Sequence, residues 1–250
     1  MIEINLEHVS SAAASQRAYD RLYGKSFSGV WTGQMHSRYL WLTSLLRSQP
    51  GQRLLDVSCG NGYLLRAAIR KRLDVWGLEL SEVGLKQARE MAPAASLICG
   101  NAEALPFAPG SFDYVTNIGS LEHYVSPAAS IAEMARVLKP EGVALILVPN
   151  VYGLLGNILH VWRHGDVFVD VQPLQRYATR GWWTRLLQQN HLSVVRTLRY
   201  ERELPRTWQD LGWHLAHPSK LLRALLSPLV PLNLTDSFVF LCTRQNQESA

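Results

Sequence analysis

From residue 53 onward, short apolar runs alternate with longer segments in which apolar residues recur every three or four positions. The short runs predict buried strands, and the longer segments, such as 64–69 and 131–138, predict helices with one apolar face. Because strands and helices alternate, the pattern predicts an α/β protein whose parallel sheet is covered on both faces. The strands predicted in this region cover residues 53–58, 74–80, 95–100, 112–118 and 143–149.

Two of the predicted helices carry recognisable start signals. Ser81 stands before the apolar stripe that reaches Met91, and serine is a favoured residue just before a helix. Ser126 stands before Pro127, and proline suits the first helical position. We therefore expect Ser81 and Ser126 to be N-caps.

The regular alternation ends after Asn150. A helix is predicted over 179–192, and strands are predicted over 194–202 and 237–244. Residues 12–48, ahead of the core, have helical stripes. We expect one domain over residues 1–250, with a helical N-terminal cap (1–50), a core (51–150) and two insertions (151–178 and 204–235).

Composition excludes several classes of protein. The chain has 250 residues, of which 47% are hydrophobic, and a net charge of +5. We see no secretory signal and no apolar run of the roughly 20 residues that a membrane span needs. Cys59, Cys99 and Cys242 lie far apart without metal-ligand spacing, so we expect reduced thiols in a cytoplasmic protein and no metal. The mild positive charge is compatible with an anionic partner or membrane surface.

The stretch LLDVSCGNGYLL, at residues 54–65, places two glycines where the first core strand ends. Gly60 and Gly62 allow left-handed backbone and leave room for a ligand close to the main chain. They also fit a simple tight turn. A dinucleotide-binding loop would continue with a glycine or alanine where this chain has Leu65, which argues against a nicotinamide dinucleotide.

Acidic and amide side chains follow the neighbouring strands. Asp56 precedes the glycines, where a carboxylate would repel a phosphate and attract a cation. Glu79 ends the second strand and can accept hydrogen bonds from both hydroxyls of a ribose. Asn101 and Ala102 follow the third strand, where they can meet an adenine edge. A ligand with a cation, a ribose and an adenine but no phosphate fits S-adenosylmethionine.

The same residues resemble the motifs of class I S-adenosylmethionine-dependent methyltransferases, in particular the type 11 group. The match keeps the family's order and spacing from about residue 50 to 150. The matching stretches are LDVSCGNG (55–62), Glu79, GNAEALPF (100–107), SFDYV (111–115), LEH (121–123) and EMARVLKPEGVALI (133–146).

The resemblance implies a doubly wound, Rossmann-like sheet of seven strands with the last strand antiparallel. It also implies S-adenosylmethionine as cofactor and S-adenosylhomocysteine as product. Ser58 stands where the family usually has glycine, and Asn101 stands where it usually has an acid. The cofactor-binding residues implied are Asp56, Ser58, Cys59, Gly60, Gly62, Glu79, Leu80, Asn101, Ala102, Glu103 and Asn117.

Methyl transfer from a sulfonium needs alignment and exclusion of water more than acid–base chemistry. A general base helps when the acceptor is a hydroxyl. His123 follows the fourth strand, beside the expected methyl position, and is our candidate base. A structural role in the loop is the alternative for His123.

The insertions suggest the acceptor. Segments 151–178 and 204–235 hold many large apolar residues, and Leu222 and Leu225 belong to one stripe. Packing onto the sheet explains most such residues, whereas the functional interpretation is a lid or a patch for a membrane or partner subunit. We therefore expect O-methylation of a small apolar or lipid-linked acceptor, with peripheral membrane contact and a homo-oligomer as further options.

Of two other functions, one is disfavoured and one remains open at this point. Nucleic acid is disfavoured, because the arginines between 196 and 206 alternate with acidic residues. The alternative from another class is a non-catalytic binding or scaffold protein with the methyltransferase fold, for which Ser58 and Asn101 leave room.

Overall fold

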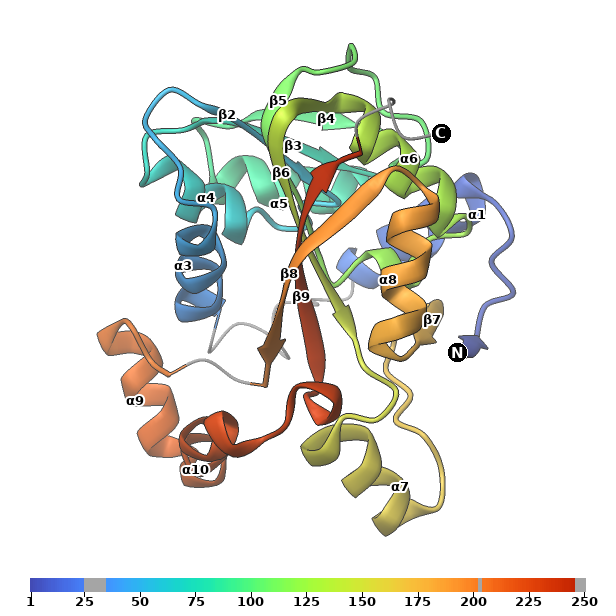
Figure 1. Cartoon of the computed structure of the whole chain (residues 1–250), viewed down its shortest axis with the longest axis vertical. Helices are drawn as coiled ribbons and strands as arrows, with labels where there is room; N and C mark the ends of the chain where they lie inside the picture. The colour runs from blue at the N-terminus through green and yellow to red at the C-terminus, as the bar shows by residue number, and fades with distance from the viewer. Residues whose placement is uncertain (25–34, 202–203, 246–250) are drawn as a thin grey trace.

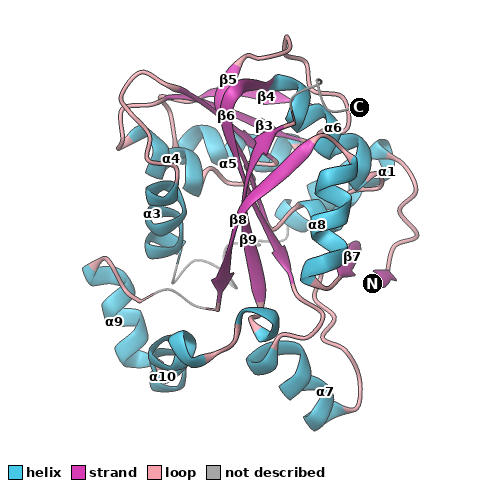
Figure 2. Cartoon of the chain, in the orientation of Figure 1, coloured by secondary structure: helices cyan, strands magenta, loops and turns pink. Residues whose placement is uncertain are grey.

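The computed structural model describes residues 1–24, 35–201 and 204–245 (Figure 1). Residues 25–34 of the predicted helical N-terminal segment, and residue 202 at the end of a predicted strand, lie outside the described residues. The described parts form a central twisted sheet with helices on both sides (Figure 2). None of the described helices is long and apolar enough to cross a bilayer.

Seven strands form the main sheet in the order β4-β3-β2-β5-β6-β9-β8. Only β9 runs against its neighbours β6 and β8, and the other pairs are parallel. The fold class and the antiparallel last strand are confirmed. The strands are β2 (Arg53–Val57), β3 (Asp74–Glu79), β4 (Ser96–Cys99), β5 (Phe112–Ile118), β6 (Leu138–Pro149), β8 (Leu192–Tyr200) and β9 (Ser237–Arg244).

Two apolar layers hold the helices on the sheet. One contains Leu42, Leu64 and Ala88, and the other contains Met134 and Trp183. Burial of such side chains supplies most of the free energy of folding. The first layer involves α3 (Met35–Leu45), α4 (Tyr63–Ile69) and α5 (Glu82–Met91), and the second involves α6 (Pro127–Val137) and α8 (Arg180–Gln189).

One strand boundary and one helix cap differ in detail from the pattern. Strand β6 begins at Leu138, five residues before the predicted start, because Leu138 pairs with Phe112 on the far side of a β-bulge. The Ser81 cap is confirmed, since its hydroxyl accepts from the Gly84 N–H at 3.2 Å. The position of the Ser126 cap, before Pro127 at the first helical position, is also confirmed, but the Ser126 side chain makes no capping hydrogen bond.

A small two-stranded ribbon joins the chain's first residues to the first insertion. Strand β1 (Ile2–Asn5) pairs antiparallel with β7 (Leu174–Tyr177). Neither strand was predicted, because each has only four residues and too few alternations to show a period. Helix α1 (Ala12–Gly24) follows β1.

Each segment predicted as an insertion follows the carboxyl end of a strand of the main sheet. The first follows β6 and forms a π-helical turn, η2 (Leu154–Ile158), and helix α7 (Leu159–His164). The second follows β8. It forms α9 (Trp208–Ala216), α10 (Pro218–Leu226) and the short turns η3 (Ser227–Leu229) and η4 (Leu232–Leu234). Helices α7, α9 and α10 lie together at the lower end of Figure 1.

Candidate active site at the carboxyl edge of the sheet

The strand order reverses between β2 and β5. Ligands of open parallel sheets bind at such a reversal, outside the carboxyl ends of the strands. Asp56 lies near the end of β2, and Glu79 ends β3 beside it. Asn117 lies near the end of β5. The tertiary structure therefore brings three of the predicted residues to one place.

The turn after β2 is left-handed at three positions. Ser58, Gly60 and Gly62 have φ angles of 62°, 54° and 83°. A Cβ atom at Gly62 would lie 3.1 Å from the Ala88 Cα, so a side chain there would collide with helix α5. Ser58 adopts the conformation that glycine adopts freely, and its hydroxyl bonds the Tyr124 hydroxyl at 2.7 Å.

Glu79 fixes this turn to the next one. Its two carboxylate oxygens accept from the Gly60 N–H at 2.8 Å and the Ser81 N–H at 3.0 Å. Each oxygen has a second lone pair, so Glu79 can still accept from two hydroxyls. Burial raises the pKa of Glu79, and the backbone hydrogen bonds oppose that shift.

Asp56 is a second buried acid in the same place. Burial raises its pKa to about 7, against a hydrogen bond from Thr116 that lowers it, and the charge of Glu79 raises it further. The Thr116 hydroxyl lies 2.6 Å from the Asp56 carboxylate. Within the described residues, no basic side chain forms an ion pair with Asp56 or Glu79. Two buried acids without a cation fit a positively charged nucleoside and oppose a phosphate.

The residues after β4 are engaged locally. The Asn101 side-chain oxygen accepts from the Glu103 N–H at 3.0 Å. A Glu103 carboxylate oxygen accepts from the Ser126 N–H at 2.8 Å, so Glu103 rather than Ser126 satisfies the start of α6. Ala102 is buried in the core layer below. These hydrogen bonds hold the segment at the edge of the sheet.

The remaining predicted residues line or support the strand ends. Leu80 is half-buried and Cys59 is buried. The Asn117 amide donates to the Val57 carbonyl at 3.1 Å and to the Tyr124 hydroxyl at 2.6 Å, and its oxygen accepts from the Leu121 N–H at 3.0 Å. Asn117 therefore holds the loop that carries the candidate base.

His123 lies in a short 3₁₀ turn, Leu121–His123. Its Nδ1 is 2.5 Å from the Leu174 carbonyl, which makes Nδ1 the donor and leaves Nε2 with a free lone pair. Burial lowers the pKa of His123 to about 4, so the imidazole is neutral at pH 7. Its Nε2 is 3.8 Å from a Glu122 carboxylate oxygen, and burial raises the pKa of Glu122 to about 8.

Sequence reasoning missed the residues of α1 that cover the glycine turn and the start of α5. The Tyr23 hydroxyl is 3.0 Å from the position of a Cβ at Gly60, and its ring packs on Gly84. Burial and then the charge of Glu79 raise the pKa of Tyr19. Asp20 accepts from the Ser81 hydroxyl at 2.6 Å. The sequence did show that Tyr19 and Tyr23 share one face of a predicted helix. Nothing in the sequence, however, places that helix over the strand ends.

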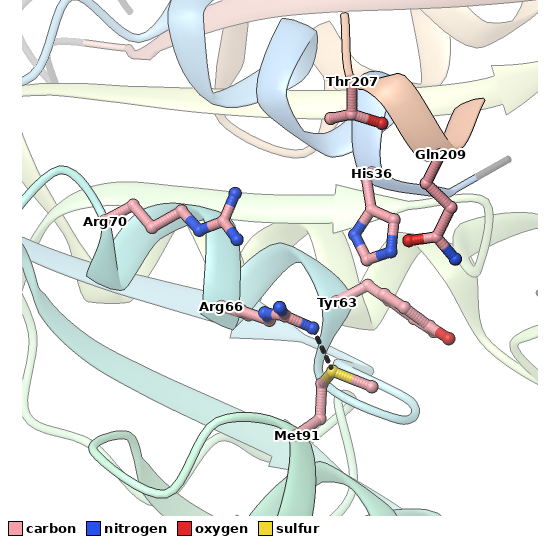
Figure 3. Close-up of a pocket in the computed structure, with 7 residues that line it drawn as sticks. All are labelled: His36, Tyr63, Arg66, Arg70, Met91, Thr207 and Gln209. Atoms are coloured by element: carbon pink, nitrogen blue, oxygen red, sulfur yellow. Dashed lines mark hydrogen bonds between the residues drawn. The ribbon is translucent and has the colours of Figure 1, made fainter. Parts of the chain in front are cut away.

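A cavity of about 450 Å³ lies elsewhere, between α3, α4, α5 and α9 (Figure 3). Among the described residues, its lining holds Arg66 and Arg70 and no acidic side chain. Arg66 donates to the Met91 sulfur at 3.4 Å. This basic lining is opposite in charge to the acids at the strand ends, so the cavity does not suit a sulfonium.

Comparison with known proteins identifies the core. A family model described as a methyltransferase domain matches residues 55–146. The demethylmenaquinone methyltransferase of Renibacterium salmoninarum is 41% identical over 97 residues, which cover 39% of this chain and 41% of that protein. The ubiquinone biosynthesis O-methyltransferase of Thiobacillus denitrificans is 40% identical over 97 residues, which cover 37% and 42%. The chain thus matches about two fifths of the length of these relatives.

Solved structures extend the likeness to the whole fold. A chain in the complex of the Haloferax volcanii Trm112 methyltransferase activator with a methyltransferase has a TM-score of 0.66 at 17% identity, and the alignment covers 94% of this chain and 100% of that one. The cyclase SpnF has a TM-score of 0.65 at 19% identity, with 94% and 97% covered. At these identities the likeness shows the fold and not the chemistry.

Three findings point to the same family: the matched core, the strand order, and the acids at the strand ends. Residues 55–146 match the type 11 methyltransferase domain family, whose cofactor is S-adenosylmethionine, and the sheet around them has the fold of the class I methyltransferases.

Proposed function

We propose that this protein transfers a methyl group from S-adenosylmethionine to a hydroxyl of a small, apolar or lipid-linked acceptor. The observation that carries the proposal is the pair of buried acids, Asp56 and Glu79, without a cation partner in the described chain. When bound, the cofactor supplies a methyl group on a sulfonium that is already a good leaving group.

The chain's own residues bind and orient. The free lone pairs of Glu79 accept from the ribose hydroxyls. The amino-acid tail lies along the turn at Gly60 and Gly62, where the absence of Cβ atoms permits close contact. Asp56 balances the positive charge. Tyr23 packs on the same turn, so its side chain moves aside when the cofactor enters.

The acceptor side is formed by the turn after β5 and by the first insertion. His123 is held by the Leu174 carbonyl of β7, and the free lone pair of its Nε2 can accept a hydrogen bond from the acceptor's hydroxyl. Arg176 donates to the Tyr124 carbonyl and, at 2.6 Å, to a Glu3 carboxylate oxygen. These contacts fix the wall that faces the acceptor and exclude water from it.

The choice of an apolar acceptor is supported by the large exposed apolar residues of both insertions. It is also supported by the names of the two similar proteins, both of which refer to quinones. Oxygen as the methylated atom is supported by the neutral histidine in the acceptor wall and by one of those relatives.

Titration calorimetry with S-adenosylmethionine tests the cofactor site. Glu79→Ala removes both hydroxyl contacts, and hydrogen bonds to a charged group are worth about 1.5–3 kcal/mol each, so we expect affinity to fall about a hundredfold or more. Glu82→Ala, an exposed acid in the first turn of α5, is the matched control and should bind like the wild type. Equal affinity in the Glu79 variant would contradict the proposed ribose contact.

A non-catalytic protein of the same fold is the second candidate. One observation favours it: the Asn101 oxygen, which replaces the family's usual acid, is already bonded to the Glu103 N–H. Absence of S-adenosylmethionine binding by the wild-type protein would favour this candidate. Binding together with transfer of labelled methyl to a demethylated quinol would favour the enzyme.

A further inference from the structure

The exposed apolar side chains are gathered in the two insertions. Among the described residues, the large apolar side chains that are exposed all lie within 151–178 and 204–235, except Met1, Leu6 and Val195. Single exposed apolar residues are ordinary on protein surfaces, but a gathered set marks a place of interaction.

Two tryptophans dominate this set. Trp162 of α7 is 80% exposed and Trp208 at the start of α9 is 88% exposed. Tryptophan carries one of the largest apolar surfaces of any side chain and is enriched where membrane meets water. Helix α10 buries Ala224 and exposes Leu222 and Leu225, so its apolar stripe turns outward.

The two insertions are tied together at one end of the molecule. A Cβ atom at Gly153 or Gly156 of the first insertion would lie within 2.8 Å of the Asp236 side chain. Asp236 forms an ion pair with Arg223 of α10, and Arg223 also pairs with Glu201 at 3.3 Å. Both insertions therefore leave the carboxyl edge of the sheet and meet at Asp236. Their helices α7, α9 and α10 lie at the lower end of Figure 1.

The charges exposed on the insertions are mainly positive. Arg163, Arg206 and Lys220 are exposed there, against the single exposed acid Asp166 among the described residues. The whole chain has a net charge of +5. Basic residues near a membrane surface each contribute about 1 kcal/mol of attraction to anionic lipid, whereas two copies of this face would repel each other.

We propose that the end formed by α7, α9 and α10 docks on an anionic phospholipid bilayer. The tryptophans and leucines enter the interface, and the basic residues remain at the headgroups. The inference goes beyond the proposed chemistry, because it concerns where the protein works. It places the carboxyl edge of the sheet, with the candidate base, on the membrane side, so that a lipid-linked acceptor can reach His123 without crossing water.

Flotation with vesicles tests the surface directly, without cofactor or acceptor. The wild type should float with vesicles of equimolar phosphatidylcholine and phosphatidylglycerol, and much less with phosphatidylcholine alone or in high salt. Trp162→Ser combined with Trp208→Ser should lower the bound fraction roughly tenfold or more. Arg163→Glu combined with Arg206→Glu should abolish the preference for anionic lipid.

Val195→Ser, on strand β8 outside the insertions, is the matched control and should float like the wild type. Circular dichroism and thermal melting of each variant exclude misfolding. A wild type that does not float, or tryptophan variants that float unchanged, would overturn the docking surface. A dimer by light scattering that the tryptophan substitutions dissociate, without vesicle binding, would assign the face to a second copy. Calorimetry with S-adenosylmethionine is independent of these results, so either proposal can fail alone.

Discussion

Individual side chains at the carboxyl edge owe their chemistry to exclusion from water. Asp56 and Glu122 have pKa values raised by burial to about 7 and about 8, and burial lowers that of His123 to about 4. Each buried group thus favours its neutral form, as desolvation requires. A Glu122 carboxylate oxygen has no hydrogen-bond partner among the described residues, so ionisation of Glu122 costs free energy of folding.

This cost predicts a pH dependence of stability. The pKa of Glu122 is higher in the folded than in the unfolded chain, so its contribution is lost as pH rises toward 8. Between pH 6.5 and 8, ionisation of Glu122 should cost about 2 kcal/mol of unfolding free energy, and ionisation of Asp56, whose pKa burial raises to about 7, adds to this loss. The pKa of His123 is lower in the folded than in the unfolded chain. His123 therefore makes stability fall as pH drops below 6.5 and does not affect the window above it. Glu122→Gln should remove most of the loss, as measured by denaturant unfolding.

The exposed Glu90→Gln on α5 is the control for this experiment and should keep the wild-type slope. Parallel pH profiles for the wild type and Glu122→Gln would show that Glu122 is not the group that titrates.

His123→Gln tests the proposed base. A positioned base is worth roughly 10²–10⁴-fold, so kcat for a hydroxyl acceptor should fall by about a hundredfold or more. The Kd for S-adenosylmethionine should stay within about twofold, because His123 contacts Leu174 and not the glycine turn. A kcat that is unchanged, with a higher KM, would assign His123 a packing role in the acceptor wall.

Helices around the sheet begin by different means. The Ser81 hydroxyl accepts from the Gly84 N–H and donates to Asp20 of α1, so one residue starts α5 and ties α1 across the strand ends. Helix α6 instead begins with a carboxylate from a distant loop, since Glu103 accepts from the Ser126 N–H. A serine precedes both helices, but only the Ser81 side chain makes a capping hydrogen bond.

Matched substitutions of the two serines distinguish how helices α5 and α6 are capped. Ser81→Ala should lower the unfolding free energy by about 1–2 kcal/mol, because it removes a cap and a buried hydrogen bond. Ser126→Ala should cost less than about 0.5 kcal/mol, as at an ordinary surface position. Urea unfolding measures both, and equal losses would contradict the difference in capping.

At the scale of the whole molecule, an ion-pair cluster joins helix α10 to the end of β8 and the start of β9. Arg223 of α10 lies between Asp236, just before β9, and the fully buried Glu201 side chain. Asp236 also packs on the first insertion. Removal of one partner from a buried pair leaves the other charge uncompensated.

Arg223→Met should therefore cost about 3 kcal/mol and loosen both insertions together. Hydrogen exchange should become faster across α7 and α10 and stay unchanged in β2 and β5. Arg163→Met, on the exposed face of α7, controls for loss of positive charge and should leave exchange unchanged. Faster exchange confined to α10 would show that the insertions are not coupled through Asp236.

The amino-acid sequence by itself determined the sheet, because strand and helix periods are local and repeat through the core. The left-handed glycine turn and the acids at the strand ends were also predictable, since each acid follows a strand whose end is visible in the sequence. The roles of the site residues and the division into core and insertions stay predictions.

Tertiary structure alone decided what covers those strand ends and what remains in water. Tyr23 lies on Gly60 because α1 crosses the sheet, and Leu174 holds His123 because β7 pairs with β1. Such contacts join residues far apart in the chain, so no local period reports them. The apolar stripe of α10 was compatible with burial or exposure. The structure leaves Leu222 and Leu225 in water, because the inner side of α10 is taken by Ala224 and the Arg223 ion pairs.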